Sequence, residues 1–319
     1  SYDATDILQK HEQIDAVISG EGELSFAAIS EGRLPWEEIG NLTFRRQEDG
    51  FIVSNPPARL LEMDELPFIY DDLTPFANKM IYYESTRGCP FGCSYCLSST
   101  STCVRYRSMD KVLSEIDYFL ANQVKQVKFV DRTFNCNHQR TKAILKHLLE
   151  KDQGKTNFHF EISADLMDEE ELELLSRMRP GLVQLEIGVQ TINQQSITAI
   201  HRSMNLDQLS DHVTKIHQTH NIHQHLDLIA GLPYEDIYSF QRSFDYVYAL
   251  APDQLQLGFL KVLKGSEMSN KAFEYGIVYQ NRAPYEVLYT KWMSYDDMIL
   301  LKQIEEMVEI YYNSGQYVN

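Results

Sequence analysis

Four of the five cysteines of this chain lie within fifteen consecutive residues. Three of them, Cys89, Cys93 and Cys96, follow the pattern C-x3-C-x2-C, and Gly88 and Gly92 stand beside them. Thiolates are standard ligands of iron-sulfur clusters and of structural zinc. Glycines allow a loop to wrap tightly enough for spaced thiols to converge. The spacing therefore predicts a metal centre with these three cysteines as ligands.

The number of thiol ligands distinguishes an iron-sulfur cluster from structural zinc. Structural zinc prefers four closed ligands, and the nearest fourth thiol, Cys103, comes seven residues after Cys96 without a second CxxC pair or a nearby histidine. Three thiolates on a 4Fe-4S cluster instead leave one iron open for a substrate or cosubstrate. The sequence favours the cluster, and a zinc-stabilised binding protein without catalysis is the alternative.

The elements that must position these thiols alternate between β-rich and helical runs. Alternation of this kind implies parallel strands joined by right-handed crossovers, and six such units are too few for a closed eight-stranded barrel. The prediction is an α/β fold, a partial (β/α)6 TIM-like barrel, whose chemistry lies at the carboxyl ends of the strands. The predicted strands are residues 80–86, 126–131, 158–163, 183–189, 223–231 and 254–260.

The cysteine loop resembles a known family. Its "TRGCPFGC" lead-in and the aromatic Tyr95 before the third cysteine are similar to the signature of radical S-adenosylmethionine enzymes, and the resemblance covers about residues 80–265. It implies a 4Fe-4S cluster whose open iron chelates S-adenosylmethionine, and an electron donor such as flavodoxin or ferredoxin. It also implies reductive cleavage of the cosubstrate to a 5'-deoxyadenosyl radical, with Tyr95 among the cofactor-binding residues.

A second set of residues, Gln190, Arg202 and Asp227, is spaced by 12 and 25 residues. This set resembles that of coproporphyrinogen-oxidase-type radical enzymes. The resemblance implies that Gln190 and Asp227 contact the ribose side of the cosubstrate and that Arg202 pairs with its carboxylate, which suits arginine geometry. The alternative is that Gln190 and Asp227 cap strand ends and that Arg202 is a solvated helix residue.

After the second strand the family usually has a glycine-rich turn, which this chain replaces with "FVDRTFN". Asp131 and Thr133 stand where they could accept or share the hydrogen bond of the methionine amino group. At "FEISAD", Ser163 stands where some relatives carry an acid, so no ribose contact from a glutamate is carried over there.

The residues outside the predicted barrel resemble cobalamin-associated radical enzymes, a group that includes methyltransferases and the anaerobic magnesium-protoporphyrin IX monomethyl ester oxidative cyclase. The predicted division is residues 1–75 as the end of a cobalamin-type domain plus linker, 76–265 as the radical barrel, and 266–319 as a helical extension with a long amphipathic helix over 294–315. No DxHxxG motif occurs. Cobalamin is therefore expected only if a missing upstream domain supplies it.

The composition limits the partners. A net charge of −17 and a pI near 5.0 disfavour nucleic acid, which weakens the alternative of a tRNA-modifying methylthiotransferase. No apolar run is long enough to cross a bilayer, and clustered rather than framework cysteines indicate reduced thiols, so a cytoplasmic location is expected. The predicted activity is methyl transfer or oxidative cyclisation of a small-molecule or tetrapyrrole-like substrate.

For the remaining candidate ligands, a structural role is favoured over a functional one. Cys103 and Cys136 are single cysteines, which are more often passive than functional. The "THNIHQHLDL" stretch suggests a metal cluster, but alternation along a strand sends His223 and His225 to one face. A polar barrel lining or core packing is the favoured interpretation of these histidines.

Overall fold

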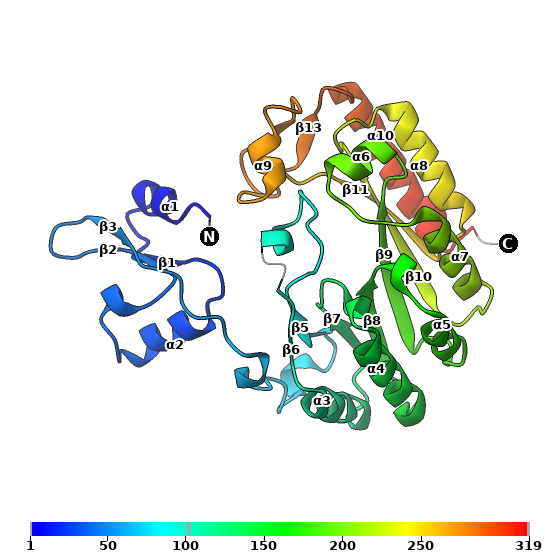
Figure 1. The fold of residues 1–319 in the computed structure, drawn as a ribbon, viewed down its shortest axis with the longest axis horizontal. Coiled ribbons are helices and arrows are strands. Elements are labelled where there is room, and N and C mark those ends of the chain that lie inside the picture. Colours follow the sequence, from blue (N-terminus) through cyan, green and yellow to red (C-terminus); the bar gives the residue numbers. More distant parts are fainter. Residues whose placement is uncertain (1, 101–102, 318–319) are drawn as a thin grey trace. The chain divides into compact units, whose positions relative to one another are not determined.

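The computed structural model describes residues 2–100 and 103–317. The chain divides into two compact units, Ser1–Leu66 and Pro67–Asn319 (Figure 1). Each unit has its own hydrophobic core. Within the described residues, no helix combines the length and the apolar character that crossing a membrane requires.

The first unit is a three-stranded antiparallel sheet with helices. Its order is α1 Ala4–Lys10, β1 Ala16–Ile18, α2 Glu23–Glu31, a 3₁₀ turn at Trp36–Glu38, β2 Leu42–Arg45 and β3 Ile52–Ser54. Leu42 and Phe44 alternate with Thr43 along β2 and form the small core with Ile39. The origin of this unit in a cobalamin-type domain stays a prediction.

The second unit is built on a six-stranded parallel sheet. The order along the sheet follows the chain, so each crossover adds its strand to the same edge, and β4 and β11 are the two ends of an open barrel. This confirms the predicted fold class. The strands are β4 Ile81–Tyr83, β7 Gln126–Phe129, β8 Asn157–Ile162, β9 Val183–Gln190, β10 His223–Ala230 and β11 Gln254–Phe259.

Helices cover the outer side of this sheet, as Figure 1 shows for the curved green and yellow part of the ribbon. Buried phenylalanines from α3, β7 and β8 fill the layer between strands and helices, with Phe134 and Phe160 stacked at 4.0 Å between ring centroids. Asp168 begins α5 with a capping box that includes Glu171. The crossover helices are α3 Met109–Ala121, α4 His138–Lys151, α5 Glu169–Ser176, α6 Gln194–Ala199, α7 Leu206–His217 and α8 Ile237–Ala249.

The inner side of the sheet is polar. Along β9, the buried Val183, Leu185 and Ile187 alternate with half-buried Gln184 and Glu186, because successive side chains of a strand point to opposite faces. A closed TIM barrel fills its interior with branched apolar side chains. This open barrel instead presents hydrogen-bonding and charged groups toward its interior.

The C-terminal part packs against the last strand of the barrel. The predicted helix over 294–315 is present as α10 Tyr295–Val308, followed by a π-helical turn at Glu309–Asn313. The Asn313 side chain bonds both backbone groups of Leu255 in β11, at 3.0 and 2.9 Å. Besides the short helix α9 Glu267–Lys271, this part contains the antiparallel pair β12 Val278–Tyr279 and β13 Val287–Tyr289. The predicted helix is thus accompanied by a short antiparallel strand pair.

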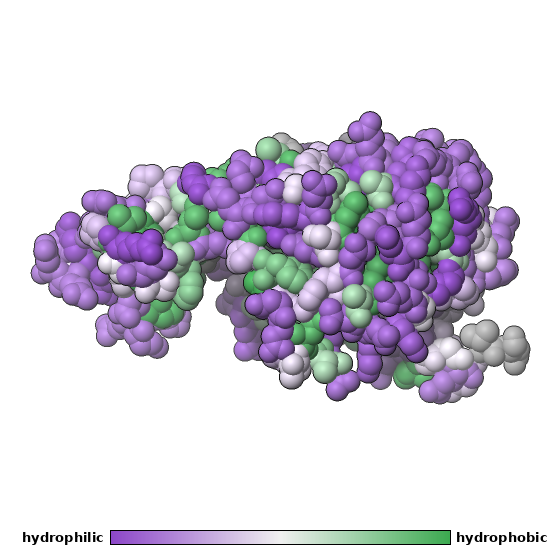
Figure 2. Space-filling view, turned by 90° about the horizontal axis from the view of Figure 1, so that it is seen from below, coloured by the Kyte–Doolittle hydropathy of each residue, from purple (hydrophilic) through white to green (hydrophobic). Residues whose placement is uncertain are grey.

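The surface shown in Figure 2 is mainly hydrophilic, with small scattered apolar areas. This agrees with the 24% of charged residues in the chain.

Candidate active site

One open cavity brings together eight of the nine predicted site residues. Its wall is formed by the cysteine loop and by residues at or beyond the carboxyl ends of β7, β8 and β9, together with one side chain of β10. This is the edge at which parallel α/β folds bind ligands. The eight are Cys89, Cys93, Tyr95, Cys96, Thr133, Gln190, Arg202 and Asp227.

The cysteine loop is fixed at both of its ends. It starts after β5 Thr86–Arg87, which pairs with β6 Arg105–Tyr106. At its far end, the Ser94 amide donates to the carbonyl of Ile200 at 2.9 Å, and the Ser94 carbonyl accepts from the Met268 amide at 2.8 Å. The thiols are therefore held by contacts to segments more than 100 residues away in the sequence.

Gly88 is the tightest point of this loop. Its φ is +102°, and a Cβ there would lie 2.2 Å from the carbonyl oxygen of Cys103. A side chain at Gly88 would have to move the loop and would adopt a backbone conformation that costs on the order of 1–3 kcal/mol. Gly92 has no such requirement, because nothing lies within 4 Å of its missing Cβ.

We expect Gly88→Ala to lower both the thermal stability and the iron bound after anaerobic reconstitution, since the loop cannot keep its course. Gly92→Ala is the matched control and should keep both. Iron and sulfide analysis with a melting curve of each variant measures this. Equal iron content in the two variants would contradict the role given to Gly88.

The spacing of the three sulfurs differs from that of a mononuclear site. A tetrahedral zinc with Zn–S bonds of about 2.3 Å places its sulfurs about 3.8 Å apart. Among the described residues, the one group of three ligand atoms lying within 4.8 Å of one another is that of His138, Asp168 and Glu171. The three cysteines are not part of that group, although all three line the cavity.

Arg202 lies in this wall rather than in solvent. It follows α6, donates from Nη1 to the Tyr95 hydroxyl at 3.4 Å and from Nη2 to the carbonyl of Gly188, and stands beside the Cys93 thiol. Its Nε is buried without a hydrogen-bond partner. Burial raises the pKa of Cys93, and Arg202 opposes that rise. The alternative of a solvated helix residue is therefore wrong.

Gln190 has a strained backbone and an unused acceptor. Its φ is +70°, at a register shift between β9 and β10, and its Oε1 is buried without a donor. Non-glycine residues rarely adopt positive φ, and such strain gathers at functional sites. Gly188, which sequence reasoning missed, makes room for this side chain, because a Cβ there would lie 2.3 Å from Gln190 Nε2.

Asp131 does not line the cavity. It is fully buried and accepts hydrogen bonds from the backbone amides of Ser85 and Thr86 at 2.8 and 3.0 Å and from the Ser85 hydroxyl at 2.5 Å. Burial raises the pKa of Asp131 to about 6, although the hydrogen bonds from Ser85 act to lower it. Asp131 thus fixes the start of β5, and a contact to the cosubstrate is no longer proposed for it. Thr133 remains in the wall, with Oγ1 3.7 Å from the Cys89 sulfur.

The floor of the cavity holds charged residues that sequence reasoning did not single out. Glu186 in β9 pairs with Lys128 at 2.8 Å and with His159 at 2.9 Å. The contact from His159, together with that from Lys128, lowers the pKa of Glu186 to about 2. Alternation of polar residues along these strands was the available signal for this floor.

The two histidines of the predicted polar face, His223 and His225, lie one strand further along the sheet, in β10. His225 Nε2 lies 3.0 Å from Asp227 Oδ1, and His225 is 7% exposed. His220 lies exposed in the turn after α7. Among the described residues, these histidines are not gathered into a metal-binding group.

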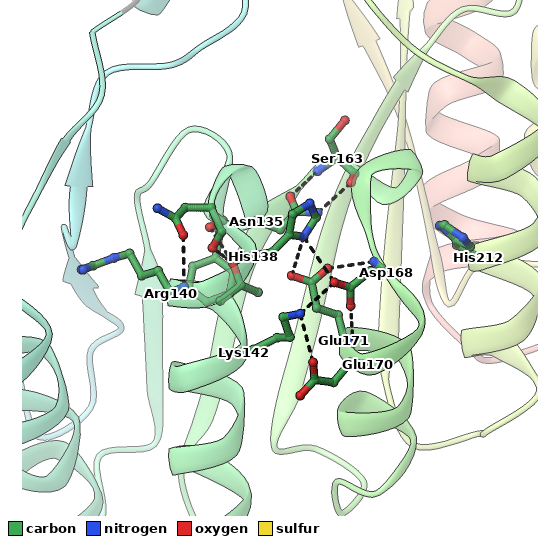
Figure 3. A network of polar contacts seen from close by, with 12 residues as sticks. Asn135, His138, Arg140, Lys142, Ser163, Asp168, Glu170, Glu171 and His212 are labelled. Atoms are coloured by element: carbon green, nitrogen blue, oxygen red, sulfur yellow. Dashed lines mark hydrogen bonds and ion pairs between the residues drawn. The ribbon is translucent and has the colours of Figure 1, made fainter.

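A polar network ties the loop after β7 to the end of β8 (Figure 3). The Asn135 side chain donates to the Ser163 carbonyl at 2.8 Å and accepts from the Ser163 amide at 2.9 Å. These two hydrogen bonds fix two neighbouring parts of the cavity wall.

The nearby cluster of His138, Asp168 and Glu171 is structural. Both carboxylates serve the capping box of α5, and Lys142 Nζ donates to Asp168 at 2.9 Å (Figure 3). A lysine ammonium therefore already supplies the positive charge that a cation would bring. The cluster anchors α4 to α5.

Comparison with known proteins identifies the family of this chain and several of its relatives. Residues 83–247 match the model of the "Radical SAM superfamily", and residues 273–319 match a "Protein of unknown function (DUF4080)". The "Uncharacterized methyltransferase PH0819" of Pyrococcus horikoshii is 27% identical over 91% of this chain and 63% of its own length. The "Cobalamin-dependent radical SAM methyltransferase TokK" of Streptomyces tokunonensis is 22% identical over 73% of this chain and 37% of its own.

The solved structure of the radical S-adenosylmethionine methyltransferase TsrM from Kitasatospora setae shares the fold, with a TM-score of 0.69 and 18% identity over 88% of this chain and 58% of that one. The chain therefore spans less than two thirds of the length of each of these three proteins.

Proposed function

Because the chain belongs to the radical S-adenosylmethionine superfamily, a family that binds a 4Fe-4S cluster and S-adenosylmethionine, we propose that it is a methyltransferase that cleaves S-adenosylmethionine reductively. Its curated relatives are named mainly as methyltransferases. They favour methyl transfer over oxidative cyclisation, and a small molecule as the acceptor. Cobalamin would be supplied by a further domain, since this chain carries no DxHxxG motif.

The observation that carries the proposal is the gathering of three thiols and an arginine around one cavity. Cys89, Cys93 and Cys96 would hold the cluster, because all three line this cavity. When bound, the cluster supplies an electron and an open iron for the cleavage of the sulfonium to a 5'-deoxyadenosyl radical. The protein's own task is to bind, orient and shield the reacting groups.

Each remaining wall residue offers a contact of the right kind. Arg202 presents a guanidinium to a carboxylate, and Tyr95 and the Gly188 carbonyl hold that guanidinium in place. The unused acceptor of Gln190 and the carboxylate of Asp227 can take hydrogen bonds from ribose hydroxyls. Thr133 lies beside Cys89 and shapes the wall there.

An anaerobic assay tests this function. The reconstituted protein should bind about four iron and four sulfide per chain and should form 5'-deoxyadenosine or S-adenosylhomocysteine from S-adenosylmethionine when dithionite is added. The same assay with added hydroxocobalamin and a library of small acceptors should show methylated products by mass spectrometry. One zinc per chain with neither nucleoside product would overturn the proposal.

A further inference from the structure

The carboxylate of Glu235 is fully buried and does not line the cavity. It stands in the loop between β10 and α8. Its Oε1 accepts from the Thr191 hydroxyl at 2.5 Å and from the Ser243 hydroxyl at 3.1 Å, whereas its Oε2 is buried without a hydrogen-bond partner among the described residues. Thr191 directly follows β9, and Ser243 belongs to α8. This one acid therefore joins three neighbouring elements.

Retaining an acid at this position costs free energy. Burial raises the pKa of Glu235 to about 7, although the hydrogen bonds from Thr191 and Ser243 act to lower it. A buried polar atom without a partner carries a penalty, and an apolar side chain of similar size would avoid it. The contacts that Glu235 makes thus serve a purpose other than packing.

The two hydroxyls extend the contact to the backbone that follows β9. A hydroxyl has one hydrogen to donate and two lone pairs that accept. Since both hydrogens point at Glu235, the lone pairs are left for backbone amides. The Asn193 amide donates to Thr191 Oγ1 at 3.0 Å, and the Ile192 amide donates to Ser243 Oγ at 3.1 Å. A carboxylate only accepts, so Glu235 sets the direction of both chains of hydrogen bonds and holds the turn after β9.

The backbone on both sides of this contact is strained. Gln190, next to Thr191, has a φ of +70°, and Tyr234, next to Glu235, has a φ of +64°. Non-glycine residues stay in the left-handed region only where the surrounding structure over-determines them. The hydrogen bond between Thr191 and Glu235 joins these two strained segments across 44 residues of the chain. Of the two strained residues, Gln190 is the one that lines the cavity.

We propose that Glu235 is a positioning residue for Gln190, which it holds toward the ribose of S-adenosylmethionine by fixing Thr191. This rests on the proposed function, because it deepens the account of the same cosubstrate site. The side chains of Gln190 and Thr191, which are adjacent in the chain, lie on opposite sides of the strand end, one in the cavity and the other against α8. Glu235 acts through the backbone between them.

A double-mutant cycle on the binding of S-adenosylmethionine to the reconstituted protein, without reductant, tests this proposal. Thr191→Val removes the hydroxyl and nearly keeps the shape of the side chain. We expect it to weaken binding roughly three- to tenfold in the wild-type background, and to cause no further loss in a Gln190→Ala background, because its effect passes through Gln190. Without S-adenosylmethionine, hydrogen exchange of the Asn193 amide should be faster in Thr191→Val, since that amide loses its acceptor.

Further variants separate positioning from general loosening of the fold. Thr191→Ser keeps the hydroxyl and should keep the affinity. Ser196→Ala is the matched control, because this equally buried hydroxyl donates to the Pro233 carbonyl at 2.6 Å instead of to Glu235. Ser243→Ala cuts the second contact to Glu235 and should cause a smaller loss of the same kind, which keeps the test decisive if Thr191→Val does not fold. Melting curves identify the folded variants.

The outcomes separate this proposal from the one on which it rests. Three results would each overturn the positioning role of Glu235. These are unchanged affinity in the folded Thr191→Val and Ser243→Ala variants, an equal loss in the wild-type and Gln190→Ala backgrounds, and full affinity in Gln190→Ala alone. Absence of S-adenosylmethionine binding by the wild type would instead overturn the proposed function, and the positioning role with it.

Discussion

Replacing Cys93 with alanine is expected to leave a folded protein that assembles no stable 4Fe-4S cluster and forms no detectable 5'-deoxyadenosine. Two thiolates would remain for a cluster that this family holds with three. Cys93 also stands beside Arg202 in the cavity wall, so its loss removes both a ligand and a neighbour of the predicted carboxylate site. Iron and sulfide analysis, the visible absorption of the cluster and the nucleoside assay all measure the effect.

Cys103→Ala is the matched control for this variant. Cys103 is exposed, and it does not line the cavity. The control should keep its iron, its absorption and its turnover, which shows that removal of a thiol from the same segment is not damaging in itself. A Cys93→Ala protein that still cleaves S-adenosylmethionine would refute the assignment of the three ligands.

The sheet was predictable because its strands alternate with helices and carry period-two patterns. The boundary that failed lies in the first strand, predicted over residues 80–86 and found as β4 Ile81–Tyr83 followed by β5 Thr86–Arg87. The amides of Ser85 and Thr86 donate to Asp131, 46 and 45 residues away, and so they are taken from the sheet. A local sequence pattern does not reveal a hydrogen bond between residues so far apart in the sequence.

The same contact explains the misplaced site residue. In the sequence, Asp131 and Thr133 are two polar residues two positions apart after one strand, and nothing distinguishes them. In the structure, Thr133 faces the cavity while the carboxylate of Asp131 is satisfied by backbone donors. Cysteine spacing was informative because all three ligands belong to one loop, whereas the burial of an acid depends on what distant segments place around it.

The charged floor of the barrel shows the same limit. Alternation along β8, β9 and β10 indicates that Glu161, Glu186 and Asp227 share a polar face, as the paired histidines already suggested. It does not show which acids find a cation. Lys128 contacts Glu186 across 58 residues, and no local pattern predicts that pairing.

The second prediction of a large effect concerns Arg202 in the proposed cosubstrate site. We expect Arg202→Ala to weaken the binding of S-adenosylmethionine by about 1.5 to 3 kcal/mol, or roughly 10- to 150-fold, because a hydrogen bond to a charged group contributes an amount of this size. The cluster should remain visible, since Arg202 is not one of its ligands. Equilibrium binding of S-adenosylmethionine under anaerobic conditions measures the loss, and the cluster absorption of the same sample reports the intact centre.

A lysine at this position separates charge from geometry. Arg202 uses one guanidinium nitrogen for the Gly188 carbonyl and another for the Tyr95 hydroxyl, and a lysine ammonium, a single point charge, cannot reproduce that fork. Arg202→Lys should therefore recover only part of the lost affinity, while Arg177→Ala, on the exposed end of α5, should lose none. Unchanged affinity in Arg202→Ala would show that the buried guanidinium serves the cysteine loop alone. Full recovery in Arg202→Lys would show that its charge matters and its shape does not.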